Sequence, residues 1–138
     1  MNRPPNWAQQ PPTAYSIVTG FFPEAKPEGG TAKCRPLLVM QVLQGKSSGK
    51  IALRVCYGTT KVKFPQRANI DLIIQNSSDL DACGLLRATR FVIDPKQQTL
   101  LEWNADNFCL WSGTQSPRRG QLPEHLQKEV AWLMMQHL

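Results

Sequence analysis

Short apolar runs alternate along the chain with polar stretches that contain proline or glycine. Several of the runs are rich in β-branched and aromatic residues, which favours strands. We expect the first four strands at residues 15–22, 36–43, 50–57 and 70–74. The second run is almost continuously apolar, as is typical of a central strand, and Pro36 stands at its start, where a missing N–H group is tolerated. The sequence QGKSSG at residues 44–49 predicts a hairpin loop.

Turn-forming residues separate the later elements. Gly58, Thr59 and Thr60 are expected to turn the chain after the third strand, and the sequence NSSDLD at residues 76–81 predicts another turn. Residues 85–93 alternate as in a strand, which Asp94 and Pro95 would end, and residues 99–103 are expected to pair with it. Residues 104–121 show no regular pattern.

The C-terminal segment has the period of a helix. Pro123 and Glu124 suit a first turn, and apolar residues recur at helical spacing, which predicts a helix over residues 123–137. Strands without intervening helices, followed by one helix, predict a mainly β fold, a small antiparallel barrel or half-barrel with a C-terminal α-helix. Residues 1–13 hold four prolines and are expected to form a flexible lead-in to a single domain at residues 14–138.

Charge is distributed unevenly along the chain. The net charge is +6, but residues 1–70 carry ten Lys or Arg and two Glu, whereas residues 71–138 carry six Lys or Arg and eight Asp or Glu. A basic first half favours a polyanionic partner such as nucleic acid, or an acidic protein segment. The alternative is a basic protein whose charge serves only solubility.

The cysteines and carboxylates do not form a recognisable metal site. The four cysteines, at positions 34, 56, 83 and 109, include no CxxC pair, and both histidines lie near the C-terminus. Asp79 and Asp81 are interpreted as turn formers, so we expect no metal and no cofactor. Reduced cysteines in a cytoplasmic protein are the simplest interpretation, and no apolar run approaches the roughly 20 residues of a membrane span. Cys34 as a nucleophile is a weaker alternative, because no histidine is nearby in sequence.

Two polar groups mark the ends of neighbouring strands. Arg35 precedes the apolar run of the second strand, and Thr59 follows the third. The guanidinium group offers a permanent charge and a fork of donors that suits a phosphate, and the threonine offers a hydroxyl. The pair indicates a phosphodiester site. The alternative for Arg35 is an ion-pairing arginine on the surface.

The order of these features resembles the PemK/MazF family of toxin endoribonucleases, whose SH3-like barrel also occurs in the CcdB gyrase poisons. The matching stretches begin with Phe21-Phe22-Pro23, Arg35-Pro36-Leu37-Leu38-Val39 and Tyr57-Gly58-Thr59-Thr60-Lys61. They continue with the segments at residues 84–89 and 120–126, so the likeness covers nearly the whole chain from Tyr15. The family's first strand commonly carries tryptophan, which is absent here, and a proline usually precedes the threonine, whereas Tyr57-Gly58 stand here.

The resemblance implies metal-independent cleavage of single-stranded RNA to 2′,3′-cyclic phosphate and 5′-OH ends. It implies that Arg35 and Thr59 are catalytic, with Thr60 as the substitute if the alignment is shifted by one residue. Arg35 would stabilise charge on the phosphoryl oxygens, because its pKa makes it a poor base. Lysines are expected to follow the RNA backbone and aromatic rings to stack on bases. The RNA-binding candidates are Phe21, Phe22, Lys26, Lys33, Tyr57, Thr60, Lys61 and Lys63.

The resemblance also implies partners. The family works as a homodimer and is inhibited by an antitoxin whose acidic tail occupies the RNA groove. Two alternatives remain open: a catalytically silent module on the same barrel, binding nucleic acid or a protein as the gyrase poisons do, and an interaction domain without a toxin role. The missing tryptophan, the altered threonine turn and the added segment at residues 104–119 favour the silent module.

Overall fold

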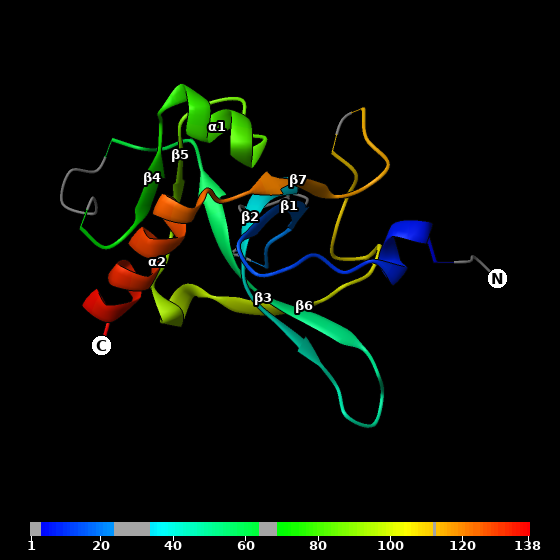
Figure 1. Ribbon diagram of the computed structural model, residues 1–138. Coiled ribbons are helices and arrows are strands. Elements are labelled where there is room, and N and C mark those ends of the chain that lie inside the picture. Colours follow the sequence, from blue (N-terminus) through cyan, green and yellow to red (C-terminus); the bar gives the residue numbers. More distant parts are fainter. Residues whose placement is uncertain (1–3, 24–33, 64–68, 112) are drawn as a thin grey trace, which may run out of the picture.

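The computed structural model describes residues 4–23, 34–63, 69–111 and 113–138. Within these ranges, seven antiparallel strands form one curled sheet, a half-barrel, and a helix ends the chain (Figure 1). The mainly β fold expected from the sequence is confirmed. In chain order the elements are η1 (Asn6–Gln9), β1 (Ser16–Phe21), β2 (Cys34–Gln44), β3 (Ile51–Thr59), β4 (Leu72–Ile74), α1 (Ser77–Cys83), β5 (Thr89–Phe91), η3 (Pro95–Gln97), β6 (Thr99–Glu102), β7 (Arg118–Gln121) and α2 (Glu124–Gln136).

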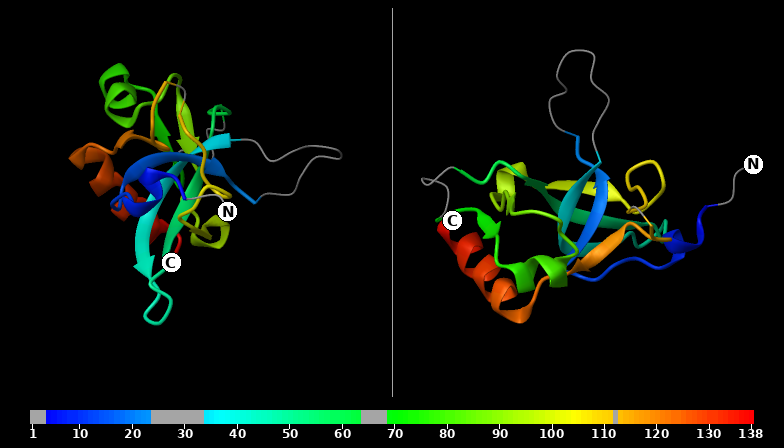
Figure 2. Two further views of the ribbon diagram at one scale, coloured as in Figure 1. Left: turned by 90° about the vertical axis from the view of Figure 1, so that its right-hand side faces the viewer. Right: turned by 90° about the horizontal axis from the view of Figure 1, so that it is seen from above.

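Strand β3 joins the two parts of the sheet. One edge of β3 pairs with β2 over most of its length. The other edge pairs first with β6, from Ala52 to Val55, and then with β5, at Gly58 and Thr59. The two parts diverge from β3, as Figures 1 and 2 show, because β5 and β6 follow one another along the same edge. The expected pairing of residues 99–103 with residues 85–93 is therefore wrong, since the short helix η3 turns the chain so that β6 lies against β3 instead.

The sheet is apolar on both faces. Along β2, Leu37 and Val39 lie on one face and Leu38 on the other, and Val55 and Cys56 divide in the same way on β3. A strand buried on both faces reads as a continuous apolar run, which is why residues 36–43 have so few polar positions. The face of Leu38 is covered by α2 through Leu126, Val130 and Leu133.

The opposite face is covered by the N-terminal segment and the chain after β6. Trp7 packs edge-on against Trp103, with ring centroids 4.7 Å apart, and its carbonyl oxygen accepts a 3.2 Å hydrogen bond from the Trp103 indole N–H. Phe108 lies against the other side of Trp103 at 4.7 Å. Residues 4–13, expected to be a loose lead-in, thus contribute a buried tryptophan to the core, because its ring covers apolar surface that the sheet leaves open.

The segment expected to be a turn at residues 76–81 is a helix instead. Asn76 caps α1, because its side-chain oxygen accepts from the backbone N–H of Ser78 at 2.9 Å. Gly84 ends the helix with a φ of 67°, a left-handed conformation that favours glycine. Asn and Ser form helix caps as readily as turns, and the sequence pattern did not distinguish the two. Asp79 and Asp81 therefore lie on a helix.

The C-terminal helix is confirmed at nearly its expected bounds. Met134 packs against the core that α2 covers, whereas Met135 is 64% exposed. Leu138 is fully exposed, because the helix ends two residues before it. In the part of the chain that the structure describes, no helix has the length and apolarity to cross a membrane.

Candidate functional site

The pairing of β2 and β3 brings the segments that carry the two candidate catalytic residues close to each other. The antiparallel register matches Leu37 with Tyr57 and Leu38 with Cys56. The pairing ends at Leu37 and Tyr57, and Arg35 and Thr59 each lie two residues beyond this last pair, within the bounds of their strands. Continued in the same register, the two strand ends would place both side chains within reach of one phosphate group.

Arg35 and Thr59 share a face of the sheet with Tyr57. Side chains alternate along a strand, so Arg35 follows Leu37, and Thr59 follows Tyr57, on the face opposite α2. The intervening Gly58 allows the strands to approach closely. A Cβ at Gly58 would lie 2.8 Å from the Phe91 ring and 3.0 Å from the Pro36 carbonyl oxygen. Any side chain at position 58 would therefore push β2 and β5 away from β3.

The turn that carries Thr60 begins two residues later than the sequence suggested. Gly58 and Thr59 belong to β3, where they pair with Phe91 and Arg90, so the expectation that they turn the chain is wrong. The cause is β5, which continues the hydrogen bonding of β3 after β6 has ended. The Thr59 hydroxyl oxygen accepts from the Lys61 backbone N–H at 3.2 Å, so its proton can be donated to a ligand.

A buried ion pair holds this turn in place. Arg90 donates to the Lys61 carbonyl oxygen at 2.9 Å through Nε, and to the Asp71 carboxylate at 2.6 Å through Nη1. Both side chains are nearly inaccessible to solvent. Because Arg90 is also opposite Thr59, it fixes the strand end and the turn together. The sequence does not identify Arg90 and Asp71 as a pair. The two residues are 19 positions apart, and neither an arginine in an alternating strand nor a single carboxylate is a local signal of an ion pair.

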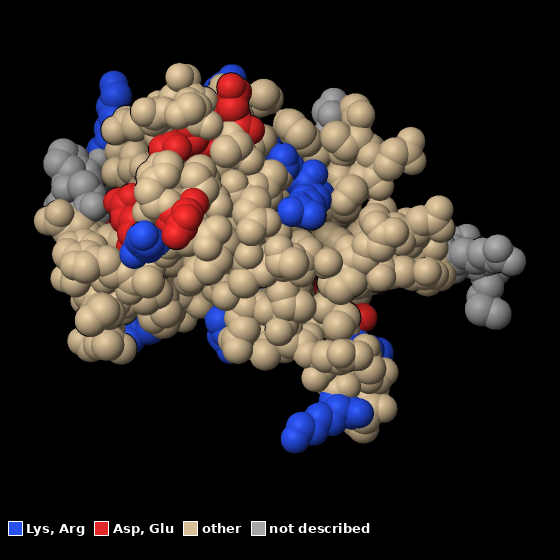
Figure 3. Space-filling model, in the orientation of Figure 1, with Lys and Arg blue, Asp and Glu red and all other residues tan. Residues whose placement is uncertain are grey.

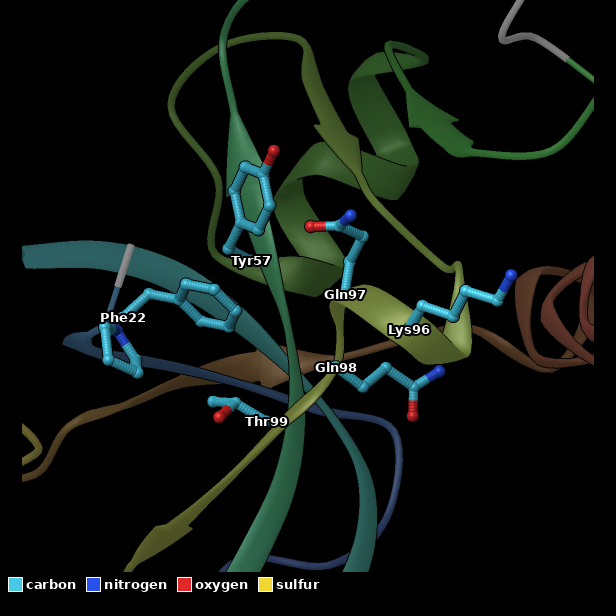
Figure 4. A pocket seen from close by; sticks show the side chains of 7 residues that line it. Phe22, Tyr57, Lys96, Gln97, Gln98 and Thr99 are labelled. Carbon is cyan, nitrogen blue, oxygen red and sulfur yellow. The ribbon is translucent and has the colours of Figure 1, made fainter. Parts of the chain in front are cut away.

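Two aromatic candidates lie together beside a hollow. The Phe22 and Tyr57 rings are 5.0 Å apart between centroids and tilted by 46°. Phe22 belongs to the core, whereas Tyr57 is half-buried. The hollow next to them measures about 340 Å³, and residues 96–99 form its opposite wall (Figure 4). A second hollow of about 260 Å³ shares Tyr57 and Gln97 with the first and is also lined by Arg90, Val92 and Asp94.

Only some of the basic candidates fall among the residues that the structure describes. Thr60, Lys61 and Lys63 are exposed just after β3, on the turn that Arg90 holds. Lys26 and Lys33 lie outside the described residues. Figure 3 shows acidic side chains gathered over α1 and α2, whereas the extended β2–β3 hairpin, which carries Lys46 and Lys50, has basic ones. On this face of the molecule, the acidic side chains are therefore separated from the basic ones of the hairpin.

The neighbour of Arg35 is bonded to a distant cysteine. Cys34 and Cys109 form a disulfide, with Cα atoms 6.9 Å apart and a sequence separation of 75. The expectation of four reduced cysteines is therefore wrong for this pair, and the disulfide sulfur of Cys34 is not a free nucleophile. The pairing arises because both chain segments flank β1: Cys34 is opposite Phe21, and the Cys109 backbone N–H donates to the Thr19 carbonyl oxygen at 3.1 Å. Sequence spacing gave no hint of it.

The other two cysteines, Cys56 and Cys83, are free and lie in the core. Burial raises the pKa of the Cys83 thiol to about 11, with a further contribution from Asp79. Burial also raises the pKa of Cys56, and Asp71 adds to the shift. Both thiols stay protonated at neutral pH and cannot act as nucleophiles there. Among the described residues, no group of three or more His, Cys, Asp or Glu side chains could hold a metal ion.

The site therefore combines a guanidinium group, a hydroxyl, a half-buried tyrosine ring and exposed lysines at one edge of the sheet. This set can bind a phosphodiester and an adjoining base without a metal. Arg119 is not part of this set. Its guanidinium carbon lies 5.1 Å from the centroid of the Trp111 ring, and burial lowers the pKa of Arg119. The chain matches no protein-family model and shows no significant similarity to a curated protein.

Proposed function

We propose that the protein is a metal-independent endoribonuclease of the PemK/MazF type, acting as a growth-inhibiting toxin on single-stranded RNA. The observation that carries the proposal is the β2–β3 register, whose last pair, Leu37 with Tyr57, lies two residues from both Arg35 and Thr59. The half-barrel with its C-terminal helix is compatible with the SH3-like barrel of that family.

In the proposed reaction, the ribose 2′-OH loses its proton to water and attacks the adjacent phosphorus, the bond to the 5′-oxygen breaks, and the departing 5′-oxygen takes a proton from water. The products are a 2′,3′-cyclic phosphate and a 5′-OH end. Arg35 binds the non-bridging oxygens through its fork and stabilises the charge that develops on them. Thr59 donates its hydroxyl proton to a phosphoryl oxygen while its own oxygen is held by the Lys61 N–H. This arrangement requires no metal ion.

The RNA-binding roles extend from this pair. Lys61 and Lys63 lie on the exposed turn beyond Thr59 and are suited to the phosphates on either side of the scissile one. Tyr57 provides a ring for a base, and Phe22 supports that ring from the core. Thr60 is the neighbouring hydroxyl and remains the substitute for Thr59.

The partners belong to the same proposal. We infer a homodimer, because Trp132 and Met135 expose apolar surface one turn apart on α2. An antitoxin with an acidic tail would compete with RNA for the basic edge. We place the protein in the cytoplasm, where messenger RNA is found. The Cys34–Cys109 disulfide weighs against this compartment, because the cytosol keeps most thiols reduced.

The first test is cleavage of a long single-stranded RNA by the purified protein in the presence of EDTA. We expect discrete fragments with 2′,3′-cyclic phosphate ends. Arg35→Ala is expected to lower the rate by on the order of 10²–10³-fold, as for the loss of one transition-state donor. Thr59→Val removes a neutral donor and should cost less. Arg118→Ala, on the exposed part of β7, is the matched control and should cleave at the wild-type rate.

Three outcomes decide between the alternatives. Cleavage by the wild type and by Arg118→Ala, but not by Arg35→Ala, supports the nuclease. A folded wild-type protein that binds RNA without cutting it would favour the catalytically silent module. Equal cleavage by the wild type and Arg35→Ala would refute the assignment of Arg35, and circular dichroism of each variant separates lost chemistry from lost folding.

A further inference from the structure

Two neighbouring hollows share one wall, and this wall is made by Tyr57 and Gln97. The first hollow is also lined by Phe22, Pro23 and Thr99, and the second by Arg90, Val92 and Asp94. Tyr57 comes from β3, two residues before Thr59, and Gln97 is the last residue of η3. The double hollow therefore begins two residues along β3 from Thr59, the residue proposed to contact the scissile phosphate.

The Gln97 side chain is available to a ligand, whereas its neighbour is not. Gln98 donates to the Ile93 carbonyl oxygen at 2.8 Å and contacts the Met134 sulfur, so its amide supports the packing of α2. Among the described residues, the Gln97 side chain has no hydrogen-bond partner, and the residue is exposed. Figure 4 shows the Gln97 amide directed toward the Tyr57 ring, while Lys96 and Gln98 extend away from it.

The short helix η3 holds this glutamine in place. The Gln97 backbone N–H donates to the Asp94 carbonyl oxygen at 2.8 Å, and the Asp94 side chain caps the same turn through the Lys96 N–H at 3.0 Å. Pro95 restricts the backbone at the first position of the turn. Opposite it, Tyr57 is held by its contact with the buried Phe22 ring. An aromatic face and an amide thus stand on fixed supports on two sides of one space.

We propose that the double hollow binds an unpaired nucleobase next to the cleaved phosphate, with Tyr57 stacking on the base and the Gln97 amide reading its edge. This inference rests on the proposed ribonuclease function. It makes Gln97 a determinant of the sequence that is cut.

The chemistry of the amide favours adenine. A glutamine side chain presents one donor and one acceptor side by side, and adenine is the base with this complementary pair on both of its exposed edges, N6 with N7 and N6 with N1. Guanine presents two acceptors, O6 and N7, on the corresponding outer edge. Adenine therefore offers the Gln97 amide a donor–acceptor pair on its outer edge as well as on its Watson–Crick edge, whereas guanine offers only acceptors on the outer edge.

The test compares cleavage-site sequences in a random-sequence RNA for the wild type, Gln97→Ala and Gln75→Ala. Gln75 is an exposed glutamine outside the hollow and serves as the matched control. We expect adenine to be enriched about tenfold at one position next to the cut by the wild type and Gln75→Ala, as one bidentate contact allows. Gln97→Ala should still cut, but without this enrichment. Identical sequence preferences in all three proteins would overturn the proposal.

A second measurement does not depend on catalysis. Fluorescence anisotropy would give the affinity for short 2′-O-methyl oligonucleotides, which cannot be cleaved, with and without a single adenine. We expect the adenine to strengthen binding about tenfold for the wild type and not for Gln97→Ala. Adenine-dependent binding that is lost in Gln97→Ala, without any RNA cleavage by the wild type, would refute the proposed nuclease activity and support the base-binding site. Cleavage by the wild type, together with no effect of adenine on its binding, would refute the base site and keep the nuclease.

Discussion

Arg90 and Asp71 are the residues on which the geometry of the candidate site depends most. They join the end of β5 to the chain before β4, and through the Lys61 carbonyl oxygen they reach the turn after Thr59. Both are almost fully buried, so their charges depend on each other for compensation. Neither needs to contact a substrate to affect activity, because each positions the strand end that carries Thr59.

We expect Asp71→Asn to lower the free energy of unfolding by about 3–5 kcal/mol, because it removes the negative charge that pairs with the buried Arg90 guanidinium. Urea denaturation followed by circular dichroism measures the change. Asp106→Asn, at an exposed carboxylate in the segment after β6, is the control and should differ from wild type by less than about 0.5 kcal/mol. Equal destabilisation by the two variants would contradict the importance of the ion pair.

At the scale of elements, the segment between β6 and β7 is more than an irregular insertion. It packs Phe108 into the core, and the Phe21 backbone N–H donates to the Asn107 carbonyl oxygen at 2.8 Å. Its Cys109 is bonded to Cys34, the residue before Arg35. The segment thereby ties the start of β2, where the candidate catalytic arginine lies, to the far side of β1.

We expect reduction of the Cys34–Cys109 disulfide to cost about 2–4 kcal/mol of stability, because it releases a long closed loop in the unfolded chain. Guanidinium denaturation with and without dithiothreitol measures the effect. The control is the double variant Cys34→Ser, Cys109→Ser, whose unfolding should not respond to the reductant. Coincident curves for the reduced and oxidised wild type would show that the bond does not constrain the fold.

At the scale of the whole molecule, the two faces of the curled sheet have different coverings. The helix α2 covers one face, and its outer side exposes Trp132 (53%) and Met135 (64%) to solvent. The other face is covered by Trp7, Trp103 and Phe108, and it leads toward Tyr57 and the hollows at its edge. Exposed apolar surface and candidate site therefore lie on different parts of the molecule.

We expect the protein to form a dimer with twice its 15.5 kDa mass, and Trp132→Lys to convert it to a monomer by removing the largest exposed apolar group on α2. Size-exclusion chromatography with light scattering measures the mass. Leu86→Lys, at a residue that is 82% exposed but lies before β5, should leave the dimer intact. A monomeric wild type would rule out this interface.

Local patterns in the sequence were enough to predict several elements. Short apolar runs identified β1, β2 and β3, because strands buried on both faces have few polar positions, and the repeat of about four residues identified α2, which buries one face. The fold class followed from the order of these elements. Asn76 and its neighbours were misread, because the same polar side chains cap helices and form turns.

The candidate pair Arg35 and Thr59 could be named from the sequence because each stands at the end of an apolar run, but only the pairing of β2 with β3 brought these two strand ends to the same edge of the sheet. The partners of β3, the Arg90–Asp71 pair, the Cys34–Cys109 disulfide and the place of Gln97 were decided by the tertiary structure alone. The spacing of apolar residues indicates which side of a helix or strand is buried, and this spacing involves only residues that are close together in the sequence. Contacts between residues 19 to 75 positions apart depend on how the whole sheet curls, and no local pattern encodes that.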